Sequence, residues 1–185
     1  MRRIKKSVDI HSGLESTLMI LASRLKSKGD RPAIELLKDY SEVPDIECYP
    51  GLLNQVFMNL LANAIDALDS ACDDPDWTGE VPTLKIVTQW HSDSHELEVQ
   101  IADNGIGMDE QTQAKLFDPF FTTKPVGKGT GLGLSISYQI IVENHSGTLA
   151  CTSQQGQGAT FTIRLPQKVP ASVASRVPEI RTAVR

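Results

Sequence analysis

A polar stripe runs along one predicted helix, which spans residues 51–72. Gln55, Asn59, Asn63 and Asp66 recur at intervals of four, four and three residues, so their side chains share one face. Asparagine and aspartate are poor helix formers, and a merely solvated face would favour Glu, Lys or Arg. A carboxamide oxygen that faces a cleft suits Mg²⁺, which completes its coordination with water and substrate phosphates. The stripe therefore favours a metal-binding face over a solvated one.

A second candidate site directly follows a predicted strand, in the run Asp103-Asn104-Gly105-Ile106-Gly107. A carboxylate at a strand end can accept a hydrogen bond from an exocyclic amine, and the glycines let a flat base approach the backbone. Asn-Gly is also a common turn dipeptide, so a simple tight turn is an equally good interpretation of this run alone. The functional interpretation is an adenine site at Asp103.

Glycines alternate with other residues farther along the chain, at Gly127, Gly129, Gly131 and Gly133. The last two begin a predicted helix, whose free N–H groups and dipole attract an anion. Phosphate is the candidate, with Lys124 and Lys128 as mobile cations nearby. Glycine is also common in flexible linkers, but this run continues without a break into an apolar helix. It lacks the GxxxxGK[ST] spacing of a Walker A loop.

Three of the five phenylalanines lie in the loop between these two runs, at Phe117, Phe120 and Phe121. Leu116 and Pro119 accompany them. The cluster is either a small satellite core or an apolar clasp that closes a lid over a nucleotide. The two interpretations are compatible, and the sequence does not separate them.

Three helices and six short strands are expected to position these residues. The helices are predicted at 12–27, 51–72 and 132–144, and the strands at 32–40, 46–49, 84–90, 97–102, 147–152 and 159–165. Residues 103–131 are predicted to form a long, largely irregular loop, which in a compact domain usually has a function or is mobile. Because the strands pair mostly in adjacent hairpins, an α+β fold is favoured over a doubly wound parallel sheet.

Composition narrows the range of partners and compartments. The chain has 185 residues and a formal net charge of −5, which argues against nucleic acid as the main partner. No apolar run approaches the roughly 18 residues of a membrane span, so no membrane contact is expected from this domain. Three widely separated cysteines without CxxC spacing are typical of reduced thiols in the cytoplasm.

Together these motifs resemble, in order, the ATP-binding domain of sensor histidine kinases, which belong to the Bergerat ATP-fold family. The resemblance rests on the four runs 54–67, 103–108, 116–124 and 127–134 and covers roughly residues 8–166. It implies a two-layer α/β sandwich in which helices cover one face of a mixed, mostly antiparallel sheet, with an ATP lid at about 109–130. Residues 1–7 are expected to belong to a preceding segment, and 167–185 to form a flexible tail.

The resemblance also implies roles for particular residues. Asn63 corresponds to the Mg²⁺ ligand, Asn59 to a polar neighbour that helps to hold the phosphates, and Asp103 to the adenine-binding carboxylate. Asn59, Asn63 and Lys124 are the expected catalytic residues. The expected ATP-binding set is Asn59, Asn63, Asp66, Asp103, Gly105, Gly107, Phe117, Phe120, Lys124, Lys128, Gly129, Thr130, Gly131, Leu132, Gly133 and Thr160. Thr160 resembles the threonine that holds adenine, usually through water.

The implied reaction is transfer of the γ-phosphoryl group of Mg·ATP to a histidine on a dimerising helical hairpin, with a response regulator as the indirect partner. No such hairpin is recognisable in this sequence. The four histidines, His11, His91, His95 and His145, are interpreted as structural, and His145 as a cation favoured by a helix C-terminus. The full-length protein is expected to be either soluble or membrane-anchored.

Two other functions remain open. Related ATPases that hydrolyse ATP resemble one another in placing Glu, the general base for water, four residues before the Mg²⁺ asparagine. Here that position is Asn59, and a carboxamide cannot take up a proton usefully near neutral pH. We therefore expect slow hydrolysis. The alternatives are a Bergerat-type ATPase and a regulatory module that binds nucleotide without transferring phosphate.

Overall fold

The computed structural model describes residues 5–29, 31–75, 77, 81–124 and 129–168. In chain order the elements are β1 (Lys6–Val8), α1 (Ile10–Leu25), β2 (Glu35–Tyr40), β3 (Ile46–Cys48), α2 (Pro50–Cys72), β4 (Thr83–His91), β5 (Glu96–Asp103), α3 (Glu110–Lys115), α4 (Gly133–Gln139), a π-helix η1 (Ile140–Asn144), β6 (Thr148–Ser153) and β7 (Ala159–Pro166). The predicted helices and strands are confirmed, with boundaries shifted by at most three residues.

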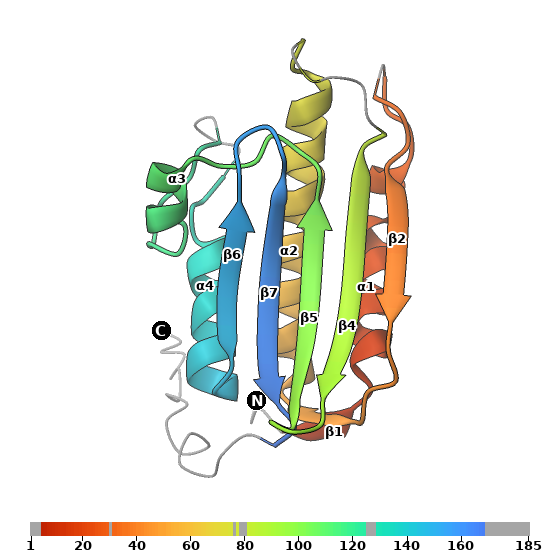
Figure 1. Ribbon diagram of the computed structural model, residues 1–185, viewed down its shortest axis with the longest axis vertical. Helices are drawn as coiled ribbons and strands as arrows, with labels where there is room; N and C mark the ends of the chain where they lie inside the picture. The colour runs from red at the N-terminus through yellow and green to blue at the C-terminus, as the bar shows by residue number, and fades with distance from the viewer. Residues whose placement is uncertain (1–4, 30, 76, 78–80, 125–128, 169–185) are drawn as a thin grey trace, which may run out of the picture.

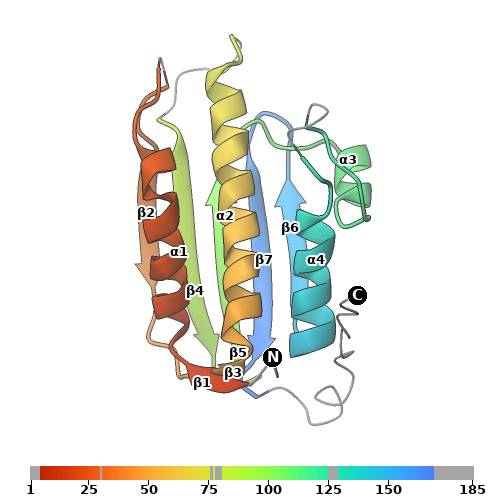
Figure 2. The ribbon, with the colours of Figure 1, turned by 180° about the vertical axis from the view of Figure 1, so that it is seen from behind.

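Two layers make up the molecule. Five strands form one sheet in the order β2-β4-β5-β7-β6, in which β2 pairs with β4 in parallel and every other pair is antiparallel. Helices α1, α2 and α4 cover one face of this sheet and leave the other face open (Figures 1 and 2). The predicted two-layer sandwich with a mixed, mostly antiparallel sheet is therefore confirmed.

The core forms between the apolar face of α2 and the apolar residues of the sheet. Helix α2 turns Val56, Leu60 and Leu61 toward the sheet, where they are fully buried. Strand β5 presents Val99 and Ile101 to the same interior at a spacing of two residues. The polar stripe of α2 lies off this apolar face. Among the described residues, no helix is both long and apolar enough to cross a membrane.

Three local features differ from the sequence-based expectations. Lys6 and Ser7, assigned to a preceding segment, belong to β1, which pairs with β3 in a separate two-stranded sheet. The loop after β5 contains the short helix α3, which Asp109 caps by accepting a hydrogen bond from the Thr112 N–H at 2.7 Å. The second buried helix ends as the π-helix η1 rather than as an α-helix. Residues 169–185 of the predicted tail lie outside the described residues.

Candidate functional site

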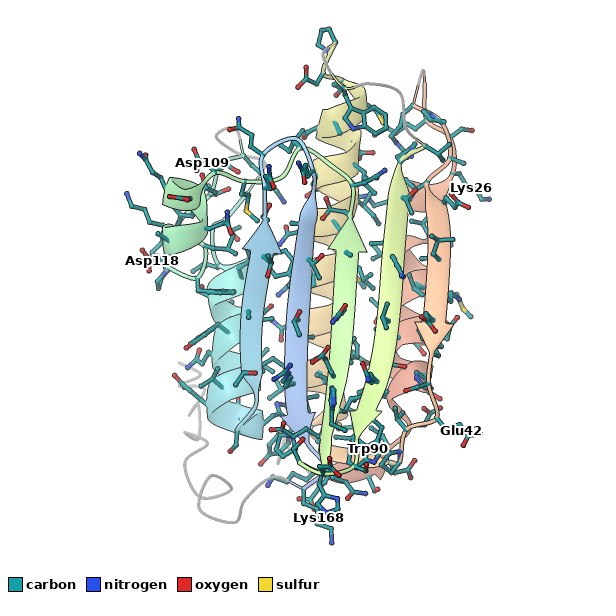
Figure 3. The ribbon with its side chains drawn as sticks, in the orientation of Figure 1. Lys26, Glu42, Trp90, Asp109, Asp118 and Lys168 are labelled. Atoms are coloured by element: carbon teal, nitrogen blue, oxygen red, sulfur yellow. The ribbon has the colours of Figure 1, made fainter. Side chains whose placement is uncertain are left out.

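The candidate site lies at the end of the sheet where β5 ends and β7 begins. The second half of α2 and the start of α4 reach the same end, which the segment containing α3 also borders (Figures 1 and 2). In Figure 3, Asp109 and Asp118 mark that segment near α3, whereas Trp90 and Lys168 mark the opposite end of the molecule. The fold thus brings the polar stripe, the glycine runs and the phenylalanine loop together.

Asp103 is the last residue of β5, and only 8% of its surface is exposed. Its Oδ1 accepts a hydrogen bond from the Gly105 N–H at 2.9 Å, and the Ala159 N–H also donates to the carboxylate. Burial outweighs these two donors and raises the pKa of Asp103 to about 6. The carboxylate is therefore ionised at neutral pH, and its lone pairs allow it to accept a further donor such as an exocyclic amine.

The turn after Asp103 is held between α2 and the β6–β7 turn. A Cβ on Gly105 would lie 2.8 Å from the backbone of Ala67 in α2, so only glycine permits this approach. A Cβ on Gly107 would lie only 2.0 Å from the carbonyl oxygen of Gln154. The Asn104 side chain accepts a hydrogen bond from the Thr83 N–H at 2.7 Å. This packing against α2 and the β6–β7 turn fixes the position of Asp103.

The structure does not bring Thr160 into this site. Along β7, Ala159 and Phe161 face the helices and are buried, whereas Thr160 and Thr162 face the open side of the sheet. Thr160 therefore points away from the side on which Asp103 lies, and its assignment as an adenine-binding residue is corrected. Ala159 occupies the inward position. The alternation of apolar residues along β7 in the sequence would have predicted that position 159, not 160, faces the helices.

A cation site joins α2 to the segment after α3. The Lys124 ammonium donates to Asn63 Oδ1 at 2.9 Å and also forms an ion pair with Asp66 Oδ2, although it lies 61 residues from Asn63 in sequence. One cation thus contacts a carboxamide oxygen and a carboxylate oxygen at once. These hard oxygen donors fit Mg²⁺, which typically takes one or two protein ligands and fills the remaining positions with phosphate and water. Asn63, Asp66 and Lys124, which the sequence assigned to one site, are thus in contact, and their roles stay predictions.

A network of charges extends this cation site into α1. Arg24 donates to Asp66 Oδ1, the oxygen that Lys124 does not use, and it lies 3.5 Å from Asp69. The buried Arg31 pairs with Asp69 at 2.7 Å. Burial raises the pKa of Asp66, but the hydrogen bonds from Lys124 and Arg24 outweigh burial, and the net shift is downward. Nothing in the sequence indicated these arginines, which lie far from any motif.

Asn59 connects α2 to the start of α4. Its Nδ2 donates to the Gly133 carbonyl at 3.0 Å and to Ser137 Oγ at 3.1 Å. The N-cap residue of α4 is Leu132, whose side chain cannot accept from the N–H groups of the first turn. Asn59 thus holds the start of α4 in place, and the Thr130 hydroxyl accepts the Leu132 N–H at 3.3 Å. The phosphate-binding role of this helix start stays a prediction.

The phenylalanine cluster divides into two parts. Leu116 is buried in the core, and Phe117 packs on Tyr138 of α4 with ring centroids 5.1 Å apart. Phe120 is 76% exposed and has a φ of +67°, a value that is unusual for a residue other than glycine. Phe117 thus packs against the hydrophobic core, whereas Phe120 lies on the surface. The roles of both side chains in ATP binding stay predictions.

Gly131 fixes the return of the chain toward α4. Its φ is +65°, and a Cβ at this position would lie 2.4 Å from the carbonyl carbon of Phe120. A Cβ on Gly129 would lie 2.8 Å from the Thr122 hydroxyl and 3.2 Å from the side chain of Lys124. These contacts dock the glycine run onto the segment that carries Lys124. Two residues of the predicted phosphate site, Gly127 and Lys128, lie outside the described residues.

His145 has a structural role, as expected, but not as a cation. Only 1% of its surface is exposed, and its Nδ1 donates to the Ile140 carbonyl at 2.8 Å in η1. Its Nε2 then accepts from the Tyr49 N–H at 3.0 Å, at the N-cap of α2. Burial lowers the pKa of His145, so the ring is neutral and joins the two helices by hydrogen bonds.

Comparisons with known proteins agree with this geometry. Residues 49–169 match the family described as "Histidine kinase-, DNA gyrase B-, and HSP90-like ATPase". Over 153 residues the chain is 36% identical to sporulation kinase E of Bacillus subtilis, covering 83% of this chain and 18% of that protein. Over 162 residues it is 36% identical to the histidine-protein kinase AtoS of Escherichia coli, covering 87% of this chain and 24% of that protein.

A solved structure shows the same fold. The catalytic domain of histidine kinase ThkA matches with a TM-score of 0.71 and 25% identity, over 89% of this chain and 97% of that chain. The chain spans less than a quarter of the length of the two curated relatives above. It belongs to the histidine kinase-, DNA gyrase B-, and HSP90-like ATPase family, as a catalytic domain of the two-component sensor histidine kinase type.

Proposed function

We propose that this domain binds Mg·ATP and transfers the γ-phosphoryl group to a histidine on a separate helical hairpin of the full-length kinase. One observation carries the proposal. A buried carboxylate, Asp103, and a carboxamide oxygen that contacts a lysine, on Asn63, lie at the same end of the sandwich and support an adenine site and a cation site there. The glycine-rich start of α4 is hydrogen-bonded to the same helix, α2, through Asn59. Base, phosphates and metal are thus each matched by a group of suitable chemistry.

Each described residue has a distinct task in this proposal. Asp103 accepts from the exocyclic amine of adenine, and the backbone around Gly105 accommodates the ring. The first-turn N–H groups of α4 bind phosphate oxygens. Asn63 would hold Mg²⁺, which supplies charge neutralisation at the phosphates when it is bound. Lys124 adds a second positive charge beside the γ-phosphoryl group.

The role of Asn59 favours transfer over hydrolysis. Its carboxamide is committed as a donor to Gly133 and Ser137, so it positions α4 and does not act as a base. Asp66, the first carboxylate after Asn63 along α2, is ion-paired with Lys124 and Arg24, and these partners lower its pKa. A group that is such a weak base activates water poorly. The acceptor histidine of the hairpin must therefore supply the nucleophile.

A phosphotransfer assay tests this function. The chain is incubated with Mg²⁺, γ-labelled ATP and the separately produced helical hairpin from its full-length protein. We expect acid-labile label on the hairpin, none on a hairpin whose acceptor histidine is replaced by alanine, and much less with Asp103→Asn. Release of free phosphate without label on the hairpin would support an ATPase instead. Binding of ATP with neither reaction would support the regulatory module.

A further inference from the structure

The cation that contacts Asn63 in the structure is the chain's own Lys124. Its ammonium lies 2.9 Å from Asn63 Oδ1 and also contacts Asp66. A Mg²⁺ ion bound to the same carboxamide oxygen would lie about 2.1 Å from it. Two cations on one oxygen would then be no more than about 5 Å apart, and they would repel each other strongly in a partly buried site. Metal and lysine therefore compete for Asn63.

Asp66 holds Lys124 in this position, and Arg24 in turn holds Asp66. Asp66 gives Lys124 one carboxylate oxygen, while Arg24 holds the other oxygen and so fixes the orientation of the carboxylate. Both side chains of the Lys124–Asp66 pair are about a third exposed, at 34% and 36%. Ion pairs of this exposure are weak. The contact is strong enough to occupy the site and weak enough to be exchanged.

Resting on the proposed function, we infer that Lys124 is a built-in counter-ion that excludes divalent metal from Asn63 until nucleotide arrives. The triphosphate contributes negative charge that serves both cations. It accepts the Lys124 ammonium in place of Asp66, and it supplies the additional oxygen ligands that a metal on Asn63 requires. Metal thus binds together with nucleotide rather than before it, and the segment that carries Lys124 moves as part of the exchange.

The test measures metal binding without nucleotide. Mn²⁺ is titrated into the protein, and free Mn²⁺ is followed by electron paramagnetic resonance for the parent chain and for Lys124→Gln. Glutamine keeps most of the side-chain length but removes the charge. We expect Lys124→Gln to bind Mn²⁺ up to about fivefold more tightly, the change that corresponds to losing a competing, partly exposed ion pair.

A matched control separates competition from general electrostatics. Lys115→Gln removes the same charge from α3, in the same loop, without changing a ligand of the cation site. It should bind Mn²⁺ like the parent. Equal Mn²⁺ affinity in the parent and Lys124→Gln would overturn the counter-ion inference, and so would an equal gain in Lys115→Gln. A separate titration of the parent with a non-hydrolysable ATP analogue and Mg²⁺ tests the proposed function itself, so its failure can be distinguished from a failure of the inference.

Discussion

Replacing Asp103 with asparagine should change the pH dependence of stability in a defined way. Asp103 is buried, and burial raises the pKa of its carboxyl from 3.8 to about 6. The folded protein therefore binds this proton more tightly than the unfolded chain does, and the ionised carboxylate lowers stability at pH 8. Asparagine has nearly the same shape and carries no titrating group, so Asp103→Asn lacks this penalty at every pH.

The magnitude follows from these pKa values. Between pH 8 and pH 5 the folded state takes up the Asp103 proton almost completely, while the unfolded chain remains ionised. Linkage then gives the parent a relative gain of about 1.4 kcal/mol in unfolding free energy over that interval. For a domain of this size the gain corresponds to a relative rise in Tm of about 3–6 °C. The variant also loses one acceptor for a backbone N–H, at about 1–3 kcal/mol, an offset that does not vary with pH.

The assay is chemical denaturation of the parent and Asp103→Asn at several values between pH 8 and pH 5. The unfolding free energy of the parent minus that of the variant should rise by about 1.4 kcal/mol as pH falls. Other titrating groups, including His145, affect both proteins and cancel in the difference. A difference that is constant with pH, or that falls toward pH 5, would refute the assignment of a raised pKa to Asp103.

Three further predictions concern other parts of the site. Asn63→Asp should weaken the binding of a non-hydrolysable ATP analogue in the presence of Mg²⁺ by at least about tenfold in calorimetry. The new carboxylate retains Lys124 and repels the phosphates. Unchanged affinity would contradict the cation site. Gly131→Ala should lower nucleotide affinity, because its Cβ would meet the backbone of Phe120. Gly29→Ala should not, because Gly29 has a similar φ of +59° but open space around its Cβ. Equal effects of the two substitutions would show that the contact between Gly131 and Phe120 is unimportant. His145→Leu should lower the unfolding free energy by about 1–3 kcal/mol in chemical denaturation, because it leaves the Tyr49 N–H unpaired. It should also remove the stability that His145 costs the parent as pH falls through about 6.5, where the histidine of the unfolded chain gains a proton. A variant as acid-sensitive as the parent would count against a neutral His145.

The elements that position the site could be predicted from the sequence because their periodicities are strong. Helix α2 has an unbroken apolar face over 23 residues, and a solvent-exposed hairpin turn separates β4 from β5. Asp103 was predicted correctly at a strand end because the alternation of β5 stops there. The lid helix α3 was missed because six mostly polar residues contain no apolar period.

The charge network could not be predicted, because it consists of tertiary contacts between distant residues. Arg24 and Asp66 lie 42 residues apart, and Lys124 and Asp66 lie 58 apart. Neither spacing has a local signature. The burial of His145 could not be predicted either. The sequence places it at a helix end but does not show that this end is buried against Tyr49. Burial, rather than position on the helix, then determines its charge.

Thr160 illustrates an error that the sequence itself could have prevented. The resemblance to known kinases pointed to a threonine after Gly158, and Thr160 was the nearest one. The alternation of Phe161, Ile163 and Leu165 places odd-numbered residues of β7 on the helical side, so an inward threonine could stand only at position 159. That position holds alanine, so the proposed adenine site relies more heavily on Asp103.

The central claim is that one end of the sandwich binds ATP together with Mg²⁺. A calorimetric titration with a non-hydrolysable ATP analogue, with and without Mg²⁺, tests it most directly when the parent and Asp103→Asn are measured side by side. The account predicts saturable binding by the parent at one site, tightened by Mg²⁺, and weakened at least about tenfold by the loss of the carboxylate that reads the base. Binding that is absent, indifferent to Mg²⁺ or unchanged in Asp103→Asn would contradict it.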